Sequence, residues 1–165
     1  MSEIEENADR KESPQYRAVS VQRLGEKHYR ATNSAGASVE FGQTEGLLTP
    51  VDMLLAAIAG CSAIDVDVVT SRRSTPETFE VKTSAMKMNE DGAVRLEDVE
   101  VSFNVRFPAD AAGQQAAKLV DRLMKLSQEK DCTVSRTIES PTHVTFINEN
   151  SENSETAQTL GNREW

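Results

Sequence analysis

The stretch TPVDMLLAAIAGCSAIDVDVV, residues 49–69, is apolar or small at nearly every position. A helix that is apolar on all sides belongs in an interior, because it has no polar face to offer to water. Thr49 can cap such a helix, Pro50 suits its first position, and Asp52 has the spacing of a capping box. We therefore expect a long buried central helix. One sheet face cannot cover such a helix, so either the sheet wraps around it or a second copy of the chain covers it. We expect both, and therefore a homodimer.

Strand patterns occur on both sides of this stretch in the sequence. Before it, loosely alternating residues predict a three-stranded meander over residues 16–24, 28–32 and 37–41. After it, the segments 79–88 and 94–107 are rich in β-branched and aromatic residues. The dipeptide of Asp91 and Gly92 joins them and is typical of a tight hairpin turn. The short connections predict antiparallel pairing in both groups.

The rest of the chain predicts a second helix and short strands. Pro108 stops the hairpin, and Asp110 can cap a helix whose apolar positions follow helical spacing to about Lys130. The segment CTVSRTI, residues 132–138, is expected to form a turn and a strand, and residues 142–148 a closing strand. This order of elements predicts an α+β fold with antiparallel sheets around the central helix.

The two ends of the chain differ in composition from its middle. Residues 1–14 carry five acids and two bases, and residues 149–165 carry four acids and one base, so the ends hold six of the nine net negative charges. Low hydrophobicity combined with net charge is typical of disordered segments. We expect a folded domain over 15–148 between a disordered acidic N-terminal tail and a disordered polar C-terminal tail.

The acidic composition limits the classes of partner. A net charge of -9 and a pI near 4.8 argue against binding to nucleic acid or to an anionic membrane surface. The N-terminus has no apolar signal region, and Asp52, Asp65 and Asp67 interrupt the apolar stretch. We therefore expect a cytoplasmic protein with no membrane partner.

Cys61 and Cys132 are the two cysteines of the chain. With two histidines and no pair at metal spacing, the sequence predicts no metal site and no cofactor. Two thiols can instead reduce a peroxide: a thiolate attacks the O–O bond, becomes a sulfenic acid and condenses with the second thiol. Asp65 lies one turn after Cys61 and would raise its pKa if close, so an activating cation must come from elsewhere. The alternative is an inert buried thiol.

Two motifs resemble those of a known family. The segment TPVDMLLAAIAGCSAIDV, residues 49–66, resembles the central-helix signature of the OsmC/Ohr superfamily, in its OsmC-like branch. EKDCTVSRTI, residues 129–138, resembles the second-cysteine motif of that superfamily. The resemblance covers about 16–148 and implies an intertwined homodimer with active sites at its interface. It also implies a peroxidase that reduces organic hydroperoxides with a dithiol reductant, in which Cys61 attacks the peroxide and Cys132 resolves the intermediate.

The family also uses an arginine and a glutamate at the reactive thiol. In the organic hydroperoxide resistance branch the glutamate directly follows the helix-starting proline, where this chain has Val51. Asp52, one position on and about 100° around the helix, and Glu45 in the preceding loop are the candidates to replace it. Arg23, near the end of the first strand, is the first candidate for the arginine, and Asp65 is a candidate to hold that arginine in place.

This departure from the family pattern leaves a second function open. Without the glutamate after the proline, the cysteines can be vestigial or sensory. The chain would then be a non-catalytic, stress-related OsmC-like dimer that binds an apolar small molecule at the subunit interface.

Overall fold

The computed structural model describes residues 13–147, which fall into two compact units divided between Ala56 and Ala57. The predicted tails, 1–14 and 149–165, lie outside the described residues, apart from Ser13 and Pro14. Their disorder, and a single folded domain over 15–148, stay predictions.

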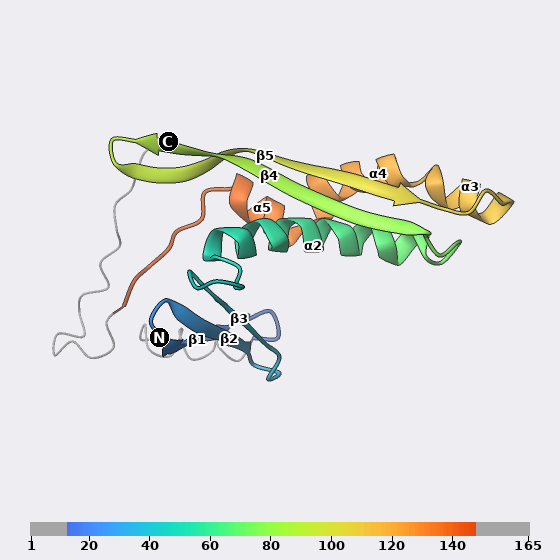
Figure 1. The fold of residues 1–165 in the computed structure, drawn as a ribbon. Helices are drawn as coiled ribbons and strands as arrows, with labels where there is room; N and C mark the ends of the chain where they lie inside the picture. Colours follow the sequence, from blue (N-terminus) through green and yellow to red (C-terminus); the bar gives the residue numbers. More distant parts are fainter. Residues whose placement is uncertain (1–12, 148–165) are drawn as a thin grey trace. The chain divides into compact units, whose positions relative to one another are not determined.

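The first unit contains a three-stranded antiparallel sheet (Figure 1). Its strands are β1 (Val19–Gly25), β2 (His28–Asn33) and β3 (Ser38–Gly42), in the order β1-β2-β3. Tyr29 of β2 stacks on its cross-strand partner Phe41 of β3, with ring centroids 5.9 Å apart. The meander predicted from the alternating residues is therefore confirmed, with each strand starting and ending within a few residues of its expected position.

Helix α2 (Pro50–Thr70) begins with the predicted capping box. The carboxylate of Asp52 accepts hydrogen bonds from the backbone N–H of Thr49, at 2.8 Å, and from its hydroxyl, at 2.6 Å. The Thr49 hydroxyl accepts in return from the backbone N–H of Asp52 at 3.2 Å. This reciprocal pairing satisfies donors at the helix start and explains why the helix begins at Pro50.

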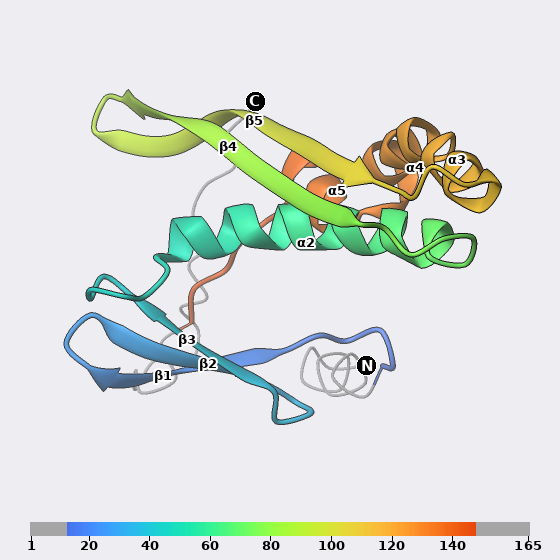
Figure 2. The same cartoon turned by 45° about the vertical axis from the view of Figure 1, so that its right-hand side comes forward.

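The second unit contains a long antiparallel hairpin of β4 (Thr78–Glu90) and β5 (Ala93–Arg106). Asp91 and Gly92 at its turn both have positive φ, 52° and 87°, as a two-residue turn of this kind requires. From Val101 to Val105 alternate residues of β5 are half-buried and the residues between them exposed, which confirms a strand with one inward face. From Ala57 onward, α2 runs alongside this hairpin (Figures 1 and 2).

The predicted second helix is broken into three pieces. Asp110 caps α3 (Ala111–Ala117), as expected, by accepting from the backbone N–H of Gly113 at 2.7 Å. The chain then forms α4 (Val120–Leu126), and its last turn widens into the π-helix η1 (Ser127–Asp131).

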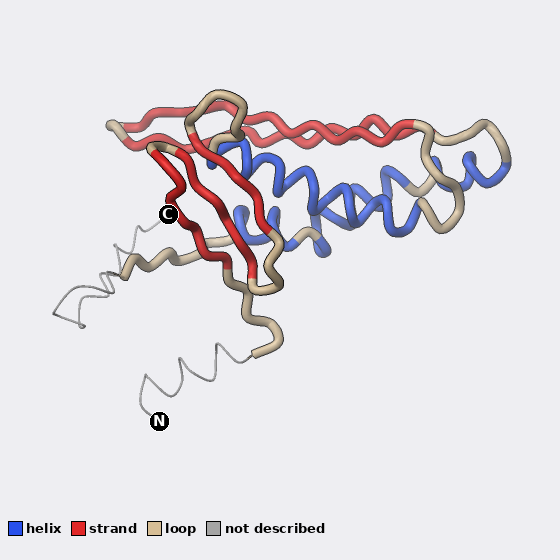
Figure 3. Tube along the Cα trace, turned by 60° about the horizontal axis from the view of Figure 1, so that its bottom comes forward, coloured by secondary structure: helices blue, strands red, loops and turns tan. Residues whose placement is uncertain are grey.

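Two strand predictions near the C-terminus are wrong. Thr133–Glu139 forms helix α5, because the Cys132 sulfur caps it by accepting from the Ser135 backbone N–H at 3.4 Å. This local cap outweighs the β-branched composition of the segment. Within the described part of 142–148, the chain forms only an isolated β-bridge at Phe146 and no strand (Figure 3).

In the single chain, α2 buries only one of its faces. The buried side chains recur every four residues: Ile58, Ser62, Val66 and Thr70. On a different face Ile64 and Val68 are exposed at 64% and 50%. By length and hydropathy α2 could cross a membrane, but core helices of soluble proteins pass the same test. The expectation that the chain has no membrane partner therefore stays a prediction.

Candidate active site

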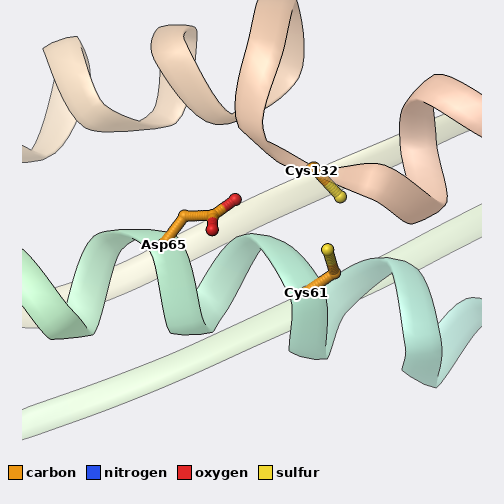
Figure 4. A group of neighbouring side chains, drawn as sticks. All are labelled: Cys61, Asp65 and Cys132. Atoms are coloured by element: carbon orange, nitrogen blue, oxygen red, sulfur yellow. The ribbon is translucent and has the colours of Figure 1, made fainter. Parts of the chain in front are cut away.

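Three side chains that could do chemistry converge in the second unit. Cys61 and Asp65 lie one turn apart on α2, and Cys132 directly follows η1. Both sulfurs and a carboxylate oxygen of Asp65 lie within 4.8 Å of one another, and the two thiols are free and turned toward each other (Figure 4). The fold thus brings together the two cysteines that a dithiol mechanism requires.

The π-helix places two of the side chains that build this site. Its wide turn is closed by the backbone N–H of Cys132, which donates to the carbonyl of Ser127 at 2.9 Å. The Ser127 side chain is almost fully buried, at 1% exposure, and its hydroxyl donates to Asp65 at 2.7 Å. Asp65 is therefore held from across the fold by a residue 62 positions away in the sequence.

Cys132 is the sulfur with the stronger set of hydrogen bonds. It is fully buried, and burial alone pushes the pKa of its thiol upward. Against this, the hydroxyl of Ser135 at 3.2 Å, the thiol of Cys61 and the backbone N–H of Ser135 all favour the thiolate. The balance lowers the pKa of Cys132 below the ordinary value for a cysteine.

Cys61 has the opposite balance. Burial raises the pKa of its thiol, and the neighbouring Cys132 and Asp65 raise it further, as the sequence led us to expect for a close Asp65. The backbone N–H of Val134 opposes this shift by donating toward the sulfur. Cys61 is only half-buried, whereas Cys132 has no exposed surface. The first thiolate is therefore favoured on the buried sulfur, and solvent reaches the other.

None of the charged residues predicted to activate Cys61, namely Arg23, Glu45 and Asp52, is shown to contact its sulfur. Arg23 lies in β1 and Glu45 in the loop after β3, both in the first unit, and their roles beside the thiol stay predictions. The carboxylate of Asp52 is engaged in the capping box, where the hydroxyl and backbone N–H of Thr49 lower its pKa.

Among the described residues, the acids near the end of α2 form no ion pair with an arginine. The sequence pattern of these acids is compatible with ion pairs to Arg72, to Arg73 or to a partner subunit, but within the single chain Asp65 accepts from Ser127, and Asp67 accepts from the hydroxyl of Ser71 at 2.6 Å. Within residues 13–147 no hydrogen bond joins a lysine or arginine to either sulfur. The thiol pair is therefore surrounded by hydroxyl and amide donors rather than by a cation.

A cavity of about 390 Å³ is lined by neighbours of the two cysteines rather than by the cysteines themselves. Ser62, next to Cys61 in the chain, and Ser135, which contacts the Cys132 sulfur, lie in its wall. Most of the remaining wall is apolar and comes from α2, β5, α4 and α5, while Glu139 is its one charged residue. The other lining residues are Ile58, Val99, Val101, Phe103, Met124, Gln128 and Ile138. A molecule with an apolar body fits this cavity best.

A family model described as OsmC-like protein matches residues 42–147. The chain belongs to the OsmC-like protein family. The resemblance inferred from the two cysteine motifs is thereby confirmed.

Solved structures share the fold of this OsmC-like protein. A hypothetical protein from Aquifex aeolicus VF5 has a TM-score of 0.60 at 20% identity, covering 75% of this chain and 87% of the other. An OsmC-like protein of unknown function from Vibrio cholerae has a TM-score of 0.60 at 12% identity, covering 76% and 95%. An OsmC-like protein from Mycoplasma pneumoniae has a TM-score of 0.57 at 11% identity, covering 78% and 90%. A search of curated protein sequences finds no match. The α+β fold class is confirmed.

Sequence reasoning missed two serines in this OsmC-like protein. Ser135 follows Cys132 at the spacing of a helix-capping box, and this signal could have identified both α5 and the hydrogen bond to the sulfur. Ser127 gave no such signal, because its contact with Asp65 exists only in the folded chain.

Proposed function

We propose that this OsmC-like protein is a thiol-dependent peroxidase that reduces organic hydroperoxides to alcohols. The observation that carries the proposal is the pair of free thiols of Cys61 and Cys132, facing each other beside an apolar cavity. The half-buried Cys61 is the sulfur that a peroxide can reach, which supports the role that the family resemblance gives it. The buried Cys132 is then the resolving thiol. The apolar wall favours a substrate with an organic group over hydrogen peroxide.

Transfer of one proton between the two sulfurs can make Cys61 the attacking thiolate. When the pair has lost one proton, the charge is favoured on Cys132, and Cys61 donates its S–H toward that thiolate. Transfer of this proton to Cys132 leaves a thiolate on Cys61. Cys132 thus serves as the base for Cys61, which supplies an activation route that needs no arginine contact.

The reaction then balances in three steps. The Cys61 thiolate attacks the terminal oxygen of the hydroperoxide, the O–O bond breaks, and the alkoxide takes the proton held by Cys132 to leave as an alcohol. Cys61 is now a sulfenic acid, and the Cys132 thiolate attacks its sulfur, releasing hydroxide, which solvent protonates to water. A dithiol reductant then reduces the Cys61–Cys132 disulfide by thiol–disulfide exchange and is itself oxidised to a disulfide.

Two matched serine variants test this proposal. With cumene hydroperoxide and an excess of dithiol, Cys61→Ser is expected to consume no more peroxide than buffer. Cys132→Ser removes the base as well as the resolving thiol, so it is expected to form a Cys61 sulfenic acid more slowly, which a dimedone probe labels, without a protein disulfide. Wild-type protein treated with one equivalent of peroxide should contain the Cys61–Cys132 disulfide in a peptide map. The proposal fails if Cys61→Ser turns over peroxide at the wild-type rate.

We also propose that the protein acts as a cytoplasmic homodimer. Support comes from the apolar α2 face that contains Gly60, Ile64 and Val68, which is exposed among the described residues 13–147. Burial of large apolar side chains against a second helix stabilises association by about 1.5–3 kcal/mol for each. The substitution Ile64→Glu should weaken association in sedimentation velocity, whereas Met86→Glu, at an exposed apolar site on β4, should not. Equal dissociation of both variants would contradict this arrangement.

The alternative is a non-catalytic dimer that binds an apolar small molecule. One observation favours it: burial and two neighbouring acidic groups raise the pKa of Cys61, the thiol that must attack. In that case both serine variants bind an apolar fluorescent probe as tightly as the wild type, and none of the three proteins accelerates peroxide loss.

A further inference from the structure

The cluster of Cys61, Asp65 and Cys132 has a composition that suits a metal ion as well as a peroxide. We propose that these three side chains form a binding site for a thiolate-preferring divalent cation, of which Zn²⁺ is the representative. Two cysteine sulfurs and one carboxylate oxygen are ligand atoms that Zn²⁺ accepts in proteins, and a fourth position would be left for water or a solute. The oxygen-preferring cations Ca²⁺ and Mg²⁺ would gain little from the sulfurs.

The geometry of the cluster suits a single ion. The three ligand atoms lie within 4.8 Å of one another. Ligands at 2.0–2.3 Å from a tetrahedral Zn²⁺ are separated by roughly 3.3–3.8 Å, so side-chain rotations of a fraction of an ångström to about 1 Å close the site. Cys61 and Asp65 come from one face of α2, and Cys132 lies between η1 and α5, where its sulfur caps α5, so helices hold all three side chains in place.

A second observation is the way in which Asp65 is held. A carboxylate ligand is normally oriented by a hydrogen bond from behind, and loss of such a partner typically weakens metal binding by about 10–100-fold. The Ser127 hydroxyl provides this bond at 2.7 Å. Because Ser127 is only 1% exposed, its hydroxyl does not bond to bulk water instead. The arrangement fixes the orientation of the Asp65 carboxylate, one oxygen of which lies within 4.8 Å of both sulfurs.

The charge of the cluster also calls for a cation. As metal ligands, the two sulfurs and the carboxylate would be three negative groups, and within residues 13–147 no lysine or arginine is hydrogen-bonded to either sulfur. A divalent ion supplies the missing positive charge and stabilises both thiolates. Binding to the dithiol form releases the protons of both thiols to solvent, so affinity falls as pH falls.

Occupancy of this site has a functional consequence. A bound ion shares the electron pairs of both sulfurs, so Cys61 cannot attack a peroxide and no disulfide can form while the ion is in place. Conversely, the Cys61–Cys132 disulfide has no thiolate to offer, so oxidation releases the ion. Metal binding itself requires only the reduced thiols, and it can be measured whether or not the protein reduces peroxides.

The test uses the reduced, tag-free full-length protein and Zn²⁺ in competition with a chromophoric chelator. One ion per chain is expected to bind, and the double variant Cys61→Ser, Cys132→Ser defines the background from other acidic groups. Asp65→Asn and Ser127→Ala should each weaken binding at least about 10-fold. The matched controls Asp67→Asn and Ser71→Ala, an acid and its hydroxyl donor on the exposed side of the end of α2, should leave affinity unchanged.

Two further measurements use only the wild-type protein, so they test the proposal even if a variant fails to fold. Co²⁺ added to the wild-type protein should give a thiolate-to-metal charge-transfer band that Zn²⁺ removes. Wild-type protein oxidised to the disulfide should bind no ion above background. The proposal is overturned if the double cysteine variant or the oxidised protein holds Zn²⁺ as tightly as the reduced wild type, or if the Co²⁺ band is absent.

Discussion

The hydrogen bond from Ser127 to Asp65 gives a sharp test of how the site is held together. Ser127 is 1% exposed and Asp65 is half-buried, with 2.7 Å between the hydroxyl and carboxylate oxygens. A buried hydrogen bond to a charged group is worth about 1.5–3 kcal/mol, and partial exposure of Asp65 places this one near the lower end. Ser127→Ala should therefore lower the free energy of unfolding by about 1.5 kcal/mol.

A double-mutant cycle separates the energy of the hydrogen bond between Ser127 and Asp65 from the other effects of removing the Ser127 hydroxyl. We expect the variants Ser127→Ala, Asp65→Asn and their combination to give a coupling energy of about 1 kcal/mol or more. Urea unfolding at one protein concentration measures this coupling energy. If the free energy of unfolding falls by about 2 kcal/mol for each molar of urea, Ser127→Ala should lower the unfolding midpoint by roughly 0.7 M.

The control cycle uses Ser71→Ala and Asp67→Asn, whose hydrogen bond is as short, at 2.6 Å, but exposed. Water replaces an exposed bond readily, so its coupling should be much smaller. If the two cycles give the same coupling, burial does not strengthen the Ser127 bond, and the argument that it orients Asp65 loses its physical basis.

Three shorter predictions concern other parts of the chain. Gly113→Ala should destabilise the protein by about 1–3 kcal/mol in urea unfolding, because an added Cβ would lie 2.0 Å from a backbone carbonyl oxygen. The bonds from Arg30 and His28 lower the pKa of Glu40, so its stabilising contribution is complete above the ordinary glutamate pKa and is lost as pH falls through the lowered value. Unfolding curves of the wild type and Glu40→Gln should then converge at acidic pH. Glu139→Gln should raise the rate of reduction of a carboxylate-bearing hydroperoxide relative to that of its methyl ester, because the cavity wall loses the negative charge of Glu139. If the ratio of the two rates does not change, Glu139 does not repel anionic substrates.

The parts of the fold that local chemistry dictates could be predicted from the sequence. The capping box at Thr49, the apolar character of α2 and the dipeptide at Asp91 each act over a few residues, so their patterns predict the structure directly. The segment after Cys132 was harder. Its β-branched residues favour a strand, but the sulfur cap and the contacts around Cys61 favour a helix, and tertiary context outweighs a weak propensity.

The candidate site divides in the same way. The cysteines could be singled out because the motifs around each resemble those of one family. The hydrogen bond between Ser127 and Asp65 could not, because it joins residues 62 positions apart and depends on a widened helical turn. That turn also sets the position of Cys132, so the spacing of the two sulfurs depends on a feature for which the sequence gives no periodic signal.

The π-helix Ser127–Asp131 contains one residue more than an α-helical path of the same length would need. The position of such an extra residue is set by which backbone carbonyls accept the hydrogen bonds of this turn. If a neighbouring set of carbonyls accepted them instead, the extra residue would lie one position further along while the helix on either side kept its hydrogen bonds. A shift of this kind turns the residue that follows by about 100° and moves it along the axis by about 1.5 Å. The spacing of the two sulfurs, which lie within 4.8 Å of each other, therefore depends on where the extra residue sits along the helix.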